Sequence, residues 1–456
     1  MKFAIYTLGC KVNQYETQAM ETELQSRGHT LVPFEELADT YIINTCAVTA
    51  TSGHKSRQII RRAQKQNPDA LVAVCGCYPQ TDPAAVAALG VDLVGGSDRR
   101  MEFLNELEKL WESRQGDVIR LKANDCPGSP RTAQDKQETK ITVGNIMSTR
   151  TYEPLPAGGL STRTRAMLKV EDGCVNFCSY CIIPYARGPV RSLPMADAAK
   201  EAGRLMAEGY KEIVLTGIEI SSWGQDLRNG FTLTDLVEAI CAAAPDCRIR
   251  LGSLEPRTVT EDFCKRLSVL PNLCPHFHLS MQSGCDETLK RMNRKYDTAR
   301  YYESVTLLRQ WFENPGITTD LIVGFPGETM EEFTAPLAFI EKCAFSAMHI
   351  FPYSRRPGTP ADKMPDQVPK GEKESRARRA SEVAGRLEKA YLESLVGQVL
   401  PILFEEEKSG LWRGHAPNYV EVWCQSGKNL HNVERQVTVT GLNGDKVMRE
   451  LQPNKR

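Results

Sequence analysis

The chain has 456 residues, and its 57 Lys or Arg balance its 57 Asp or Glu, so the formal net charge at pH 7 is zero. A hydrophobic content of 41% and a charged content of 25% are typical of a globular protein. The composition excludes a largely disordered chain and gives no sign of a polyanion partner for the whole chain, and no apolar run is long enough for a membrane span.

The number of cysteines narrows the class of protein further. The chain has 15 cysteines, an odd number that excludes complete pairing within the chain. Residues 1–20 lack the apolar core and cleavage site of a signal peptide, so we expect a cytoplasmic protein without a membrane partner. Thiols persist in that compartment, and metal or redox chemistry is therefore the leading interpretation.

Residues 1–115 alternate short apolar runs with amphipathic stretches. The runs at 2–10, 40–48, 70–77 and 91–97 indicate buried strands, and 15–28 and 54–66 indicate helices between them. This pattern predicts a doubly wound α/β domain with a parallel sheet. Cys10, Cys46 and Cys77 each end a predicted strand, so they converge on the crevice where such sheets bind ligands. They could hold a cluster, but buried cysteines at strand ends are often only small hydrophobic residues, and Cys75 competes with Cys77.

The segment 52–67 carries five Lys or Arg and no acid. Arg57, Arg61 and Lys65 recur every four residues and so share one helix face, which is a candidate phosphate contact or simply a solvated face. Residues 116–164 are rich in turn formers and are predicted to be a linker.

From residue 165 the alternation of strand and helix resumes. Six strand candidates, at 165–173, 212–220, 248–256, 276–284, 318–327 and 347–354, predict a partial (β/α)6 barrel within a domain of residues 165–395. One long charged helix is expected at 370–397. Short strands after it predict a small all-β barrel at 396–456.

Three cysteines follow the first barrel strand, in "VEDGCVNFCSYCIIPYARG". Cys174, Cys178 and Cys181 have a C-x3-C-x2-C spacing and lie where barrel active sites are built. Three thiolates on a [4Fe-4S] cluster leave one iron open for a ligand. The alternative is zinc, which normally takes four ligands in two separated pairs, and no second pair lies nearby.

This motif, with Tyr180 before the last cysteine, resembles that of the radical S-adenosylmethionine (SAM) superfamily. In that family the open iron binds SAM, and one electron cleaves it to a 5′-deoxyadenosyl radical. The segments "LTGIEI", "RLGSLEP", "LSMQSG" and "DLIVGFPGET" are similar to the family's SAM-cradling segments. The resemblance therefore implies a SAM site that includes Tyr180, Gly217, Glu219, Ser253, Gln282 and Gly324. Each of the last five could instead serve strand-end packing or a turn.

The whole chain resembles the radical SAM methylthiotransferases. "TLGCKVNQYETQAM" is especially similar to the branch that modifies threonylcarbamoyladenosine (t6A) in tRNA. The resemblance implies a second [4Fe-4S] cluster on Cys10, Cys46 and Cys77, with Cys75 as an extra thiol that departs from the family pattern. It also implies two SAM per turnover, an electron donor such as flavodoxin or ferredoxin, and replacement of the C2 hydrogen of t6A at position 37, in the anticodon loop, by a methylthio group.

The last domain resembles a TRAM module, an RNA-binding barrel. Trp412, Arg413 and Tyr419 are candidates for stacking on unpaired bases, or else for packing within the barrel. No general acid or base is expected beyond the cluster ligands. Three alternatives stay open: the prenylated-adenosine branch, the branch that modifies a ribosomal protein, and an iron-sulfur RNA-binding protein without catalysis.

Overall fold

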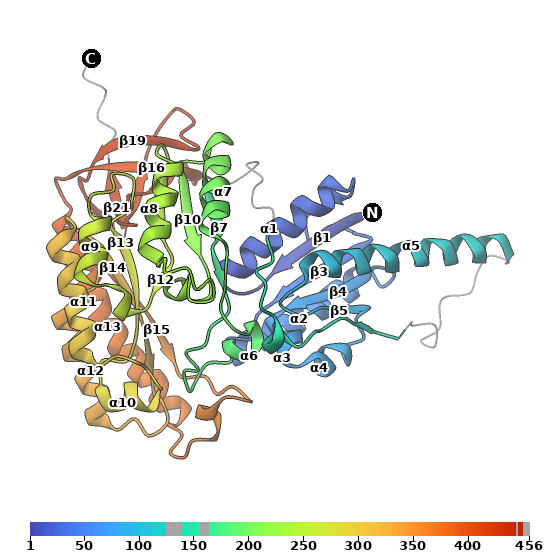
Figure 1. Ribbon diagram of the computed structural model, residues 1–456, viewed down its shortest axis with the longest axis horizontal. Coiled ribbons are helices and arrows are strands. Elements are labelled where there is room, and N and C mark those ends of the chain that lie inside the picture. The colour runs from blue at the N-terminus through green and yellow to red at the C-terminus, as the bar shows by residue number, and fades with distance from the viewer. Residues whose placement is uncertain (125–137, 156–163, 444–445, 450–456) are drawn as a thin grey trace. The chain divides into compact units, whose positions relative to one another are not determined.

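The computed structural model describes residues 1–124, 138–155, 164–443 and 446–449. The chain forms two compact units (Figure 1). The first comprises Met1–Gly158, Gly173–Val175 and Cys181–Pro189. The second comprises Gly159–Asp172, Asn176–Tyr180 and Val190–Arg456. Among the described residues, no helix has the length and hydropathy needed to cross a membrane.

A 6-stranded sheet of parallel strands forms the centre of the first unit, in the order β2-β1-β3-β4-β5-β6. Its strands are β1 Lys2–Thr7, β2 Thr30–Leu31, β3 Thr40–Thr45, β4 Leu71–Gly76, β5 Leu93–Val94 and β6 Lys140–Ile141. The predicted doubly wound fold is confirmed. Because the order reverses between β1 and β3, the topological switch point lies between these two strands.

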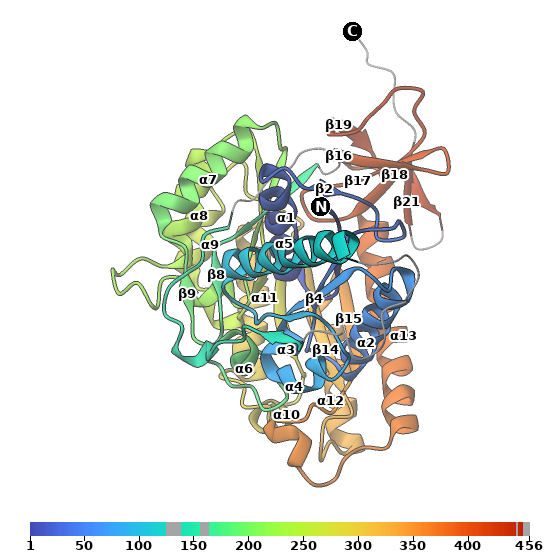
Figure 2. The same ribbon diagram turned by 90° about the vertical axis from the view of Figure 1, so that its right-hand side faces the viewer.

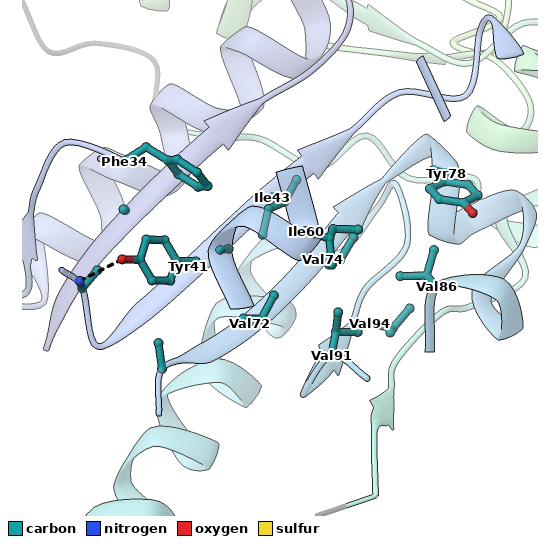
Figure 3. Packing of buried hydrophobic residues seen from close by; sticks show 14 residues of the cluster. Phe34, Tyr41, Ile43, Ile60, Val72, Val74, Tyr78, Val86, Val91 and Val94 are labelled. Atoms are coloured by element: carbon teal, nitrogen blue, oxygen red, sulfur yellow. Dashed lines mark hydrogen bonds between the residues drawn. The ribbon is translucent and has the colours of Figure 1, made fainter. Parts of the chain in front are cut away.

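Helices cover both faces of this sheet. They are α1 Lys11–Ser26, α2 Ala50–Gln66, α3 Cys77–Thr81, α4 Pro83–Ala87, α5 Arg100–Asn124 and α6 Ile183–Arg187. Figure 3 shows one core, where Ile43 and Val74 of the sheet pack with Ile60 of α2 and Val86 of α4. On the opposite face, alternate residues of the same strands pack against α1 and α5 (Figure 2). This alternation is the period of two expected of strands buried on both faces.

Part of the predicted linker belongs to the first unit. Helix α5 continues to Asn124, and β6 pairs with β5 through the register Leu93–Lys140 and Val94–Ile141. A 3-10 helix, η2, follows at Ile146–Ser148. Residues 125–137 and 156–163 of the predicted linker lie outside the described residues. A strand of two residues leaves no periodic signal from which its bounds could be predicted.

The second unit contains the predicted partial (β/α)6 barrel, called the half-barrel below, and its parallel strands follow one another in chain order. They form a 3-stranded sheet, β11-β10-β7, and a 4-stranded sheet, β12-β13-β14-β15. Gly252 separates β11 from β12, and both come from one predicted strand. The strands are β7 Arg165–Lys169, β10 Glu212–Thr216, β11 Arg248–Leu251, β12 Ser253–Leu254, β13 His276–Gln282, β14 Gly316–Val323 and β15 Ala347–Pro352.

Helices form the outer layer of this half-barrel in Figure 1. They are α7 Met195–Ala207, α8 Leu233–Ala243, α9 Glu261–Leu267, α10 Asp286–Arg291, α11 Thr298–Trp311, α12 Met330–Cys343 and α13 Lys370–Ser394. Three short 3-10 helices also occur, at η3 Ile220–Ser222, η4 Pro256–Thr258 and η5 Pro360–Lys363. Two short strands, β8 Glu171–Asp172 and β9 Arg191–Ser192, pair in antiparallel fashion beside the first barrel strand. The predicted strand-helix alternation is therefore confirmed.

The C-terminal region is all β, as predicted. Its 6-stranded sheet has the order β19-β16-β17-β18-β21-β20 and is antiparallel except for the β18–β21 pair. Its strands are β16 Val399–Lys408, β17 Leu411–His415, β18 Glu421–Cys424, β19 Val433–Thr438, β20 Gly441–Asn443 and β21 Lys446–Arg449. Ile402, Phe404 and Val422 form its core with Leu392 and Leu395 at the end of α13.

A buried polar junction joins this sheet to the half-barrel. Arg250 of β11 is 1% exposed and pairs with Glu212 of β10, with Nε–Oε1 at 2.7 Å. The same guanidinium donates to the carbonyls of Pro417, at 2.7 Å, and Ala416, at 3.3 Å. These bonds satisfy a buried cation that would otherwise be very costly, so the C-terminal sheet has a defined place on the half-barrel.

Candidate functional site

Cys10, Cys46 and Cys77 each follow a parallel strand of the first unit. Cys10 is the N-cap of α1 directly after β1, Cys46 follows β3, and Cys77 is the first residue of α3 after β4. The carboxyl ends of these three strands meet at one edge of the sheet, at its switch point. The structure therefore brings the predicted thiols to one edge.

Glycines bring the first two of these loops into close contact and shape the third. A Cβ on Gly9, which has φ +123°, would lie 3.0 Å from Cβ of Cys46. Gly76, with φ +102°, lies so close to β3 that a Cβ there would be 2.4 Å from the Thr45 carbonyl oxygen. Only glycine adopts such a backbone without strain at such a short distance. The Gly-Cys steps at Cys10 and Cys77 thus have a steric cause.

Asn13 of α1 links the loops by hydrogen bonds. Its side chain is 1% exposed, and Nδ2 donates to the carbonyls of Leu8 and Thr45, both at 2.9 Å. Its Oδ1 accepts from Sγ of Cys10 at 3.6 Å and from Nη2 of Arg187 at 2.7 Å. The amide is therefore fixed between two thiol-bearing loops.

Arg187, at the end of α6, is buried beside the thiols. Its Nε donates to Sγ of Cys77 at 3.2 Å. Its two terminal nitrogens donate to both carboxylate oxygens of Glu16, and Glu16 also pairs with Arg100 at 2.7 Å. Arg187 and Glu16 are 0% and 1% exposed. A cation and N–H donors at this edge suit a ligand with negative charge.

Cys75 and Cys77 have different surroundings. Cys75 is 0% exposed and belongs to the core between the sheet and helices α1 and α5, where burial raises its pKa to about 11. Cys77 lies two residues on, past the strand end, in contact with Arg187. Because β4 ends at Gly76 and the chain turns there into α3, Cys75 lies in the core whereas Cys77 lies at the site edge.

The thiols interact electrostatically with one another. Burial raises the pKa of Cys46, and the neighbouring thiol of Cys77 raises it further. Burial likewise raises the pKa of Cys77, against the lowering effect of the Arg187 guanidinium, and Cys10 raises it further. Metal binding removes these protons, so the site favours thiolates only when a positively charged ion compensates them.

The donor set fits an iron-sulfur cluster better than a single metal ion. Among the described residues, no three His, Cys, Asp or Glu side chains are placed to hold one ion. The cysteines of a cubane cluster bind different irons, so they stand further apart than the ligands of one ion. Three thiols on three strand ends, with an N–H donor to one sulfur, fit such a group.

The C-x3-C-x2-C segment lies between β8 and α6. The backbone N–H of Cys174 donates to the Gly188 carbonyl at 2.9 Å. In the second unit, Sγ of Cys178 accepts from Nη1 of Arg294 at 3.3 Å. Tyr180 packs against Met292, Phe325, Tyr353 and Ala361. The loop therefore combines thiols with a nearby guanidinium, as in the first unit.

Glu219 follows β10 and carries an unsatisfied carboxylate oxygen. Its Oε1 is buried and has no hydrogen-bond partner among the described residues. Burial raises the pKa of Glu219 to about 7, although the Arg294 guanidinium lowers it. An orphaned buried acceptor is costly in the free protein and fits a ligand with hydroxyl or ammonium donors, as SAM has. Oε1 of Glu171, whose Oε2 accepts from the Glu219 N–H at 2.7 Å, is likewise buried and unpartnered among the described residues.

Gly217 and Gly324 are crowded by protein atoms. A Cβ on Gly217 would lie 2.7 Å from Oε2 of Glu171. One on Gly324 would lie 2.4 Å from Cγ of Lys373 on α13. Packing against Glu171 and Lys373 therefore already accounts for a glycine at each position, and the contact of Gly217 and Gly324 with SAM stays a prediction.

Ser253 and Gln282 lie on β12 and β13. Ser253 is exposed while its neighbour Leu254 is buried. Gln282 has φ +64°, next to an irregularity in the β13–β14 pairing. A left-handed residue at a strand end indicates a locally constrained backbone. Their contact with SAM stays a prediction.

The predicted RNA contacts differ in exposure. On α2, Arg61 and Lys65 are exposed and Arg57 is half-buried, with Nη1 3.4 Å from the Tyr78 hydroxyl. The opposite side of this helix, with Ile60 and Ala63, packs on the sheet. The predicted basic face is therefore available on the first unit, and its contact with RNA stays a prediction.

The aromatic candidates of the C-terminal sheet pack against other side chains, and their contact with RNA stays a prediction. Trp412 is 7% exposed and belongs to the core of the sheet. Tyr419 stacks on His276 and His415, with ring centroids 4.7 and 5.0 Å away. Arg413 is 28% exposed and pairs with Glu406 at 2.9 Å. The packing alternative thus explains Trp412 and Tyr419.

Family models match two parts of the chain. That of the radical SAM superfamily matches residues 168–340, and that of "Uncharacterized protein family UPF0004" matches residues 2–96. The radical SAM methyltransferase TsrM from Kitasatospora setae shares the fold, with a TM-score of 0.55 and 18% identity, over 79% of this chain and 75% of that one. The half-barrel is that of a radical SAM enzyme, which uses SAM and a [4Fe-4S] cluster.

Curated relatives align along nearly the whole chain. The threonylcarbamoyladenosine tRNA methylthiotransferase MtaB of Bacillus subtilis is 40% identical, over 92% of this chain and 89% of the relative. The MtaB of Thermotoga maritima is 36% identical, over 91% and 90%. A tRNA-2-methylthio-N(6)-dimethylallyladenosine synthase of Pelotomaculum thermopropionicum is 30% identical, over 96% and 95%. The chain therefore belongs to the radical SAM methylthiotransferase family.

Sequence reasoning did not identify the polar residues around the first-unit thiols, namely Asn13, Glu16, Arg100 and Arg187. Asn13 and Glu16 lie in the "GCKVNQYE" segment and Arg187 in "IPYARG", so a charged residue close to each cysteine motif was the available signal. Nothing in the sequence pairs the two segments, which are 171 residues apart.

Glu219→Gln is expected to change stability in a pH-dependent way. Because the pKa of Glu219 is raised to about 7 from 4.5, the folded state holds a proton that the unfolded state releases, and stability falls as the pH rises between these values. At pH 8 the amide variant should therefore be more stable than the parent by about 3 kcal/mol, and at pH 5 by less than about 1 kcal/mol. Urea unfolding of the metal-free protein at both pH values measures the difference.

The control is Glu303→Gln, at a carboxylate that is 61% exposed. It should leave the difference between pH 5 and pH 8 as in the parent, because its side chain stays in water. A Glu219→Gln variant whose stability relative to the parent is the same at both pH values contradicts the burial argument. If Glu219 also binds SAM, the same variant binds SAM more weakly, so that stability and affinity change in opposite directions.

Proposed function

We propose that this protein is a tRNA methylthiotransferase that converts t6A at position 37 into its 2-methylthio derivative. The observation that carries this proposal is the 40% identity, over 92% of the chain, to a relative of that name. Three further relatives with this name are 36%, 34% and 32% identical over more than nine-tenths of the chain. The location is proposed to be the cytoplasm, in keeping with the many free cysteines.

Two metal centres are part of the proposal. Cys174, Cys178 and Cys181 would hold the cluster that binds SAM, and Cys10, Cys46 and Cys77 would hold a second [4Fe-4S] cluster. The convergence of three strand ends in the first unit supports the second centre. When bound, the clusters and SAM supply a radical able to break an aromatic C–H bond, together with the sulfur and methyl group that replace the hydrogen.

The protein's own residues bind and orient SAM and the tRNA, and they exclude water from the site. Glu219 offers a buried acceptor for a SAM donor group, and Arg294 places a cation beside Cys178. Arg61 and Lys65 of α2 offer an exposed basic face for tRNA phosphates. A reduced flavodoxin or ferredoxin is proposed as the electron donor. Among the RNA contacts predicted in the C-terminal sheet, which we still propose to be a TRAM module, Arg413 and Tyr419 are partly exposed and Trp412 is buried.

Nucleoside analysis of bulk tRNA tests the proposal. A strain from which the gene is deleted should lose 2-methylthio-t6A and accumulate t6A, and the wild-type gene on a plasmid should restore the modification. An unchanged nucleoside profile contradicts a tRNA substrate and would favour a protein substrate or a non-catalytic role. Loss of methylthiolated prenyladenosine instead would establish the second candidate, which the 30% identity to a dimethylallyladenosine synthase favours.

A further inference from the structure

One side chain beside the first-unit thiols, that of Arg187, comes from the segment that also carries the C-x3-C-x2-C cysteines. Arg187 lies six residues after Cys181, at the end of the cysteine-rich segment of the half-barrel, yet the segment Cys181–Pro189 folds with the first unit. Its Nε is 3.2 Å from Sγ of Cys77, and its Nη2 is 2.7 Å from Oδ1 of Asn13. Arg187 is 0% exposed.

Two buried cations pair with one carboxylate beside the first-unit thiols. Arg187 and Arg100 both pair with Glu16. These three buried side chains therefore carry a net charge of +1, from two cations and one anion. Arg100 donates through Nη1 to the Gly96 carbonyl, at 2.5 Å, and forms no hydrogen bond with a thiol among the described residues. Of these two cations, Arg187 is the one that donates an N–H to a sulfur at the site edge.

The geometry of α6 is fixed by other contacts. Ala186 packs with Ala47, Cys77 and Ile182 in a small buried cluster. The Ala186 carbonyl accepts from the Ser97 hydroxyl, and Gly188 is so close to Ile146 that a Cβ there would be 2.4 Å from the Ile146 carbonyl oxygen. With the backbone held on both sides of Arg187, the guanidinium has little freedom to leave the sulfur.

We propose that Arg187 is a positioning residue of the second cluster, whose N–H donor to the Cys77 sulfur stabilises the cluster in its reduced, more negative state. This inference rests on the proposed function, because it requires a cluster on Cys10, Cys46 and Cys77. Hydrogen bonds to cluster sulfurs and nearby charge both set cluster potentials, and a buried cation is poorly screened by solvent. One segment would thus supply ligands to the first cluster and a tuning residue to the second.

The test uses the full chain with Cys174, Cys178 and Cys181 all replaced by Ala, so that any cluster must occupy the first unit. Anaerobic reconstitution of this parent should give about four irons per chain. A redox titration followed by electron paramagnetic resonance then gives the midpoint potential. Resonance Raman spectroscopy gives the iron–cysteine stretching frequencies, which report hydrogen bonds to the sulfurs.

Arg187→Gln in this parent should lower the midpoint potential and raise an iron–cysteine stretching frequency. The matched control is Arg100→Gln, which removes the same charge from the same carboxylate but touches no ligand sulfur at the site edge. It should shift the potential less and leave the frequencies unchanged. If Arg187→Gln retains no iron, Arg187→Lys serves instead, because it keeps the charge and loses the planar N–H fork, and the same frequency rise is expected.

Two results overturn the inference: an Arg187 variant with the potential and frequencies of its parent, or equal shifts in the Arg187 and Arg100 variants. The second would reduce Arg187 to a charge partner of Glu16. If the parent itself binds no iron, the second cluster of the proposed function fails, and the inference fails with it. If the parent binds iron and only the Arg187 effect is missing, the inference about Arg187 fails and the proposed function is unaffected.

Discussion

Cys77→Ala should abolish methylthio transfer while the enzyme still cleaves SAM to 5′-deoxyadenosine, and Cys75→Ala should leave both reactions close to the wild-type level. Cys77 stands at the end of β4 in contact with Arg187, whereas Cys75 is packed in the core against α1 and α5. Loss of a cluster ligand should exceed the 10–100-fold effect of losing an outer-shell partner, so we expect a fall of more than about 100-fold.

The measurement is an anaerobic assay with dithionite, SAM and t6A-containing tRNA, in which modified nucleoside and 5′-deoxyadenosine are quantified together. Cys75→Ala removes only a small buried side chain, which lowers stability by about 1 kcal/mol and leaves the site edge intact. The interpretation is contradicted if Cys75→Ala loses sulfur insertion as Cys77→Ala does, or if Cys77→Ala retains it. Loss of SAM cleavage in Cys77→Ala would show that the two centres are not separate.

Gly76→Ala is expected to be the most damaging single-methyl change in the first unit. The backbone of Gly76, with φ 102° and ψ −161°, is in a region that only glycine populates readily. The added Cβ would also lie 2.4 Å from the Thr45 carbonyl oxygen, and backbone on a central strand cannot easily give way. Strain and overlap together should lower the free energy of unfolding by about 4 kcal/mol.

The matched control is Gly28→Ala. Gly28 also has a positive φ, +86°, but no atom lies within 4 Å of an added Cβ. This variant should therefore show the conformational cost alone, about 1 kcal/mol. Urea unfolding of the metal-free chain compares the two, and iron content after reconstitution shows whether the first-unit cluster survives. Equal losses of stability in both variants contradict the close approach of Gly76 to β3.

The cysteine positions could be predicted because they depend on local pattern and topology. Strands in a parallel sheet end at one edge, so thiols after β1, β3 and β4 had to share that edge once the runs were identified as strands. The choice between Cys75 and Cys77 could not be made in the same way. It depends on where β4 ends and on which face Cys75 turns to, and strand ends are poorly defined by sequence.

The polar network and the aromatic side chains could not be predicted from the sequence, because their contacts join distant parts of the chain. Arg187 reaches Glu16 across 171 residues of sequence, and no periodicity signals such a contact. Trp412 and Tyr419 have the residue types of RNA-stacking side chains, but the same types fill cores and interfaces. Other atoms lie very close to Gly217 and Gly324, as expected for these glycines. In the structure those atoms belong to Glu171 and Lys373.

The most direct test of the central claim is a single-turnover reaction of the anaerobically reconstituted chain with two tRNAs that differ only in t6A or prenyladenosine at position 37. The proposed function predicts 2-methylthio-t6A from the first tRNA, formed together with 5′-deoxyadenosine, and no methylthiolation of the second. Methylthiolation of the prenylated tRNA alone, or cleavage of SAM without sulfur insertion into either, would contradict it.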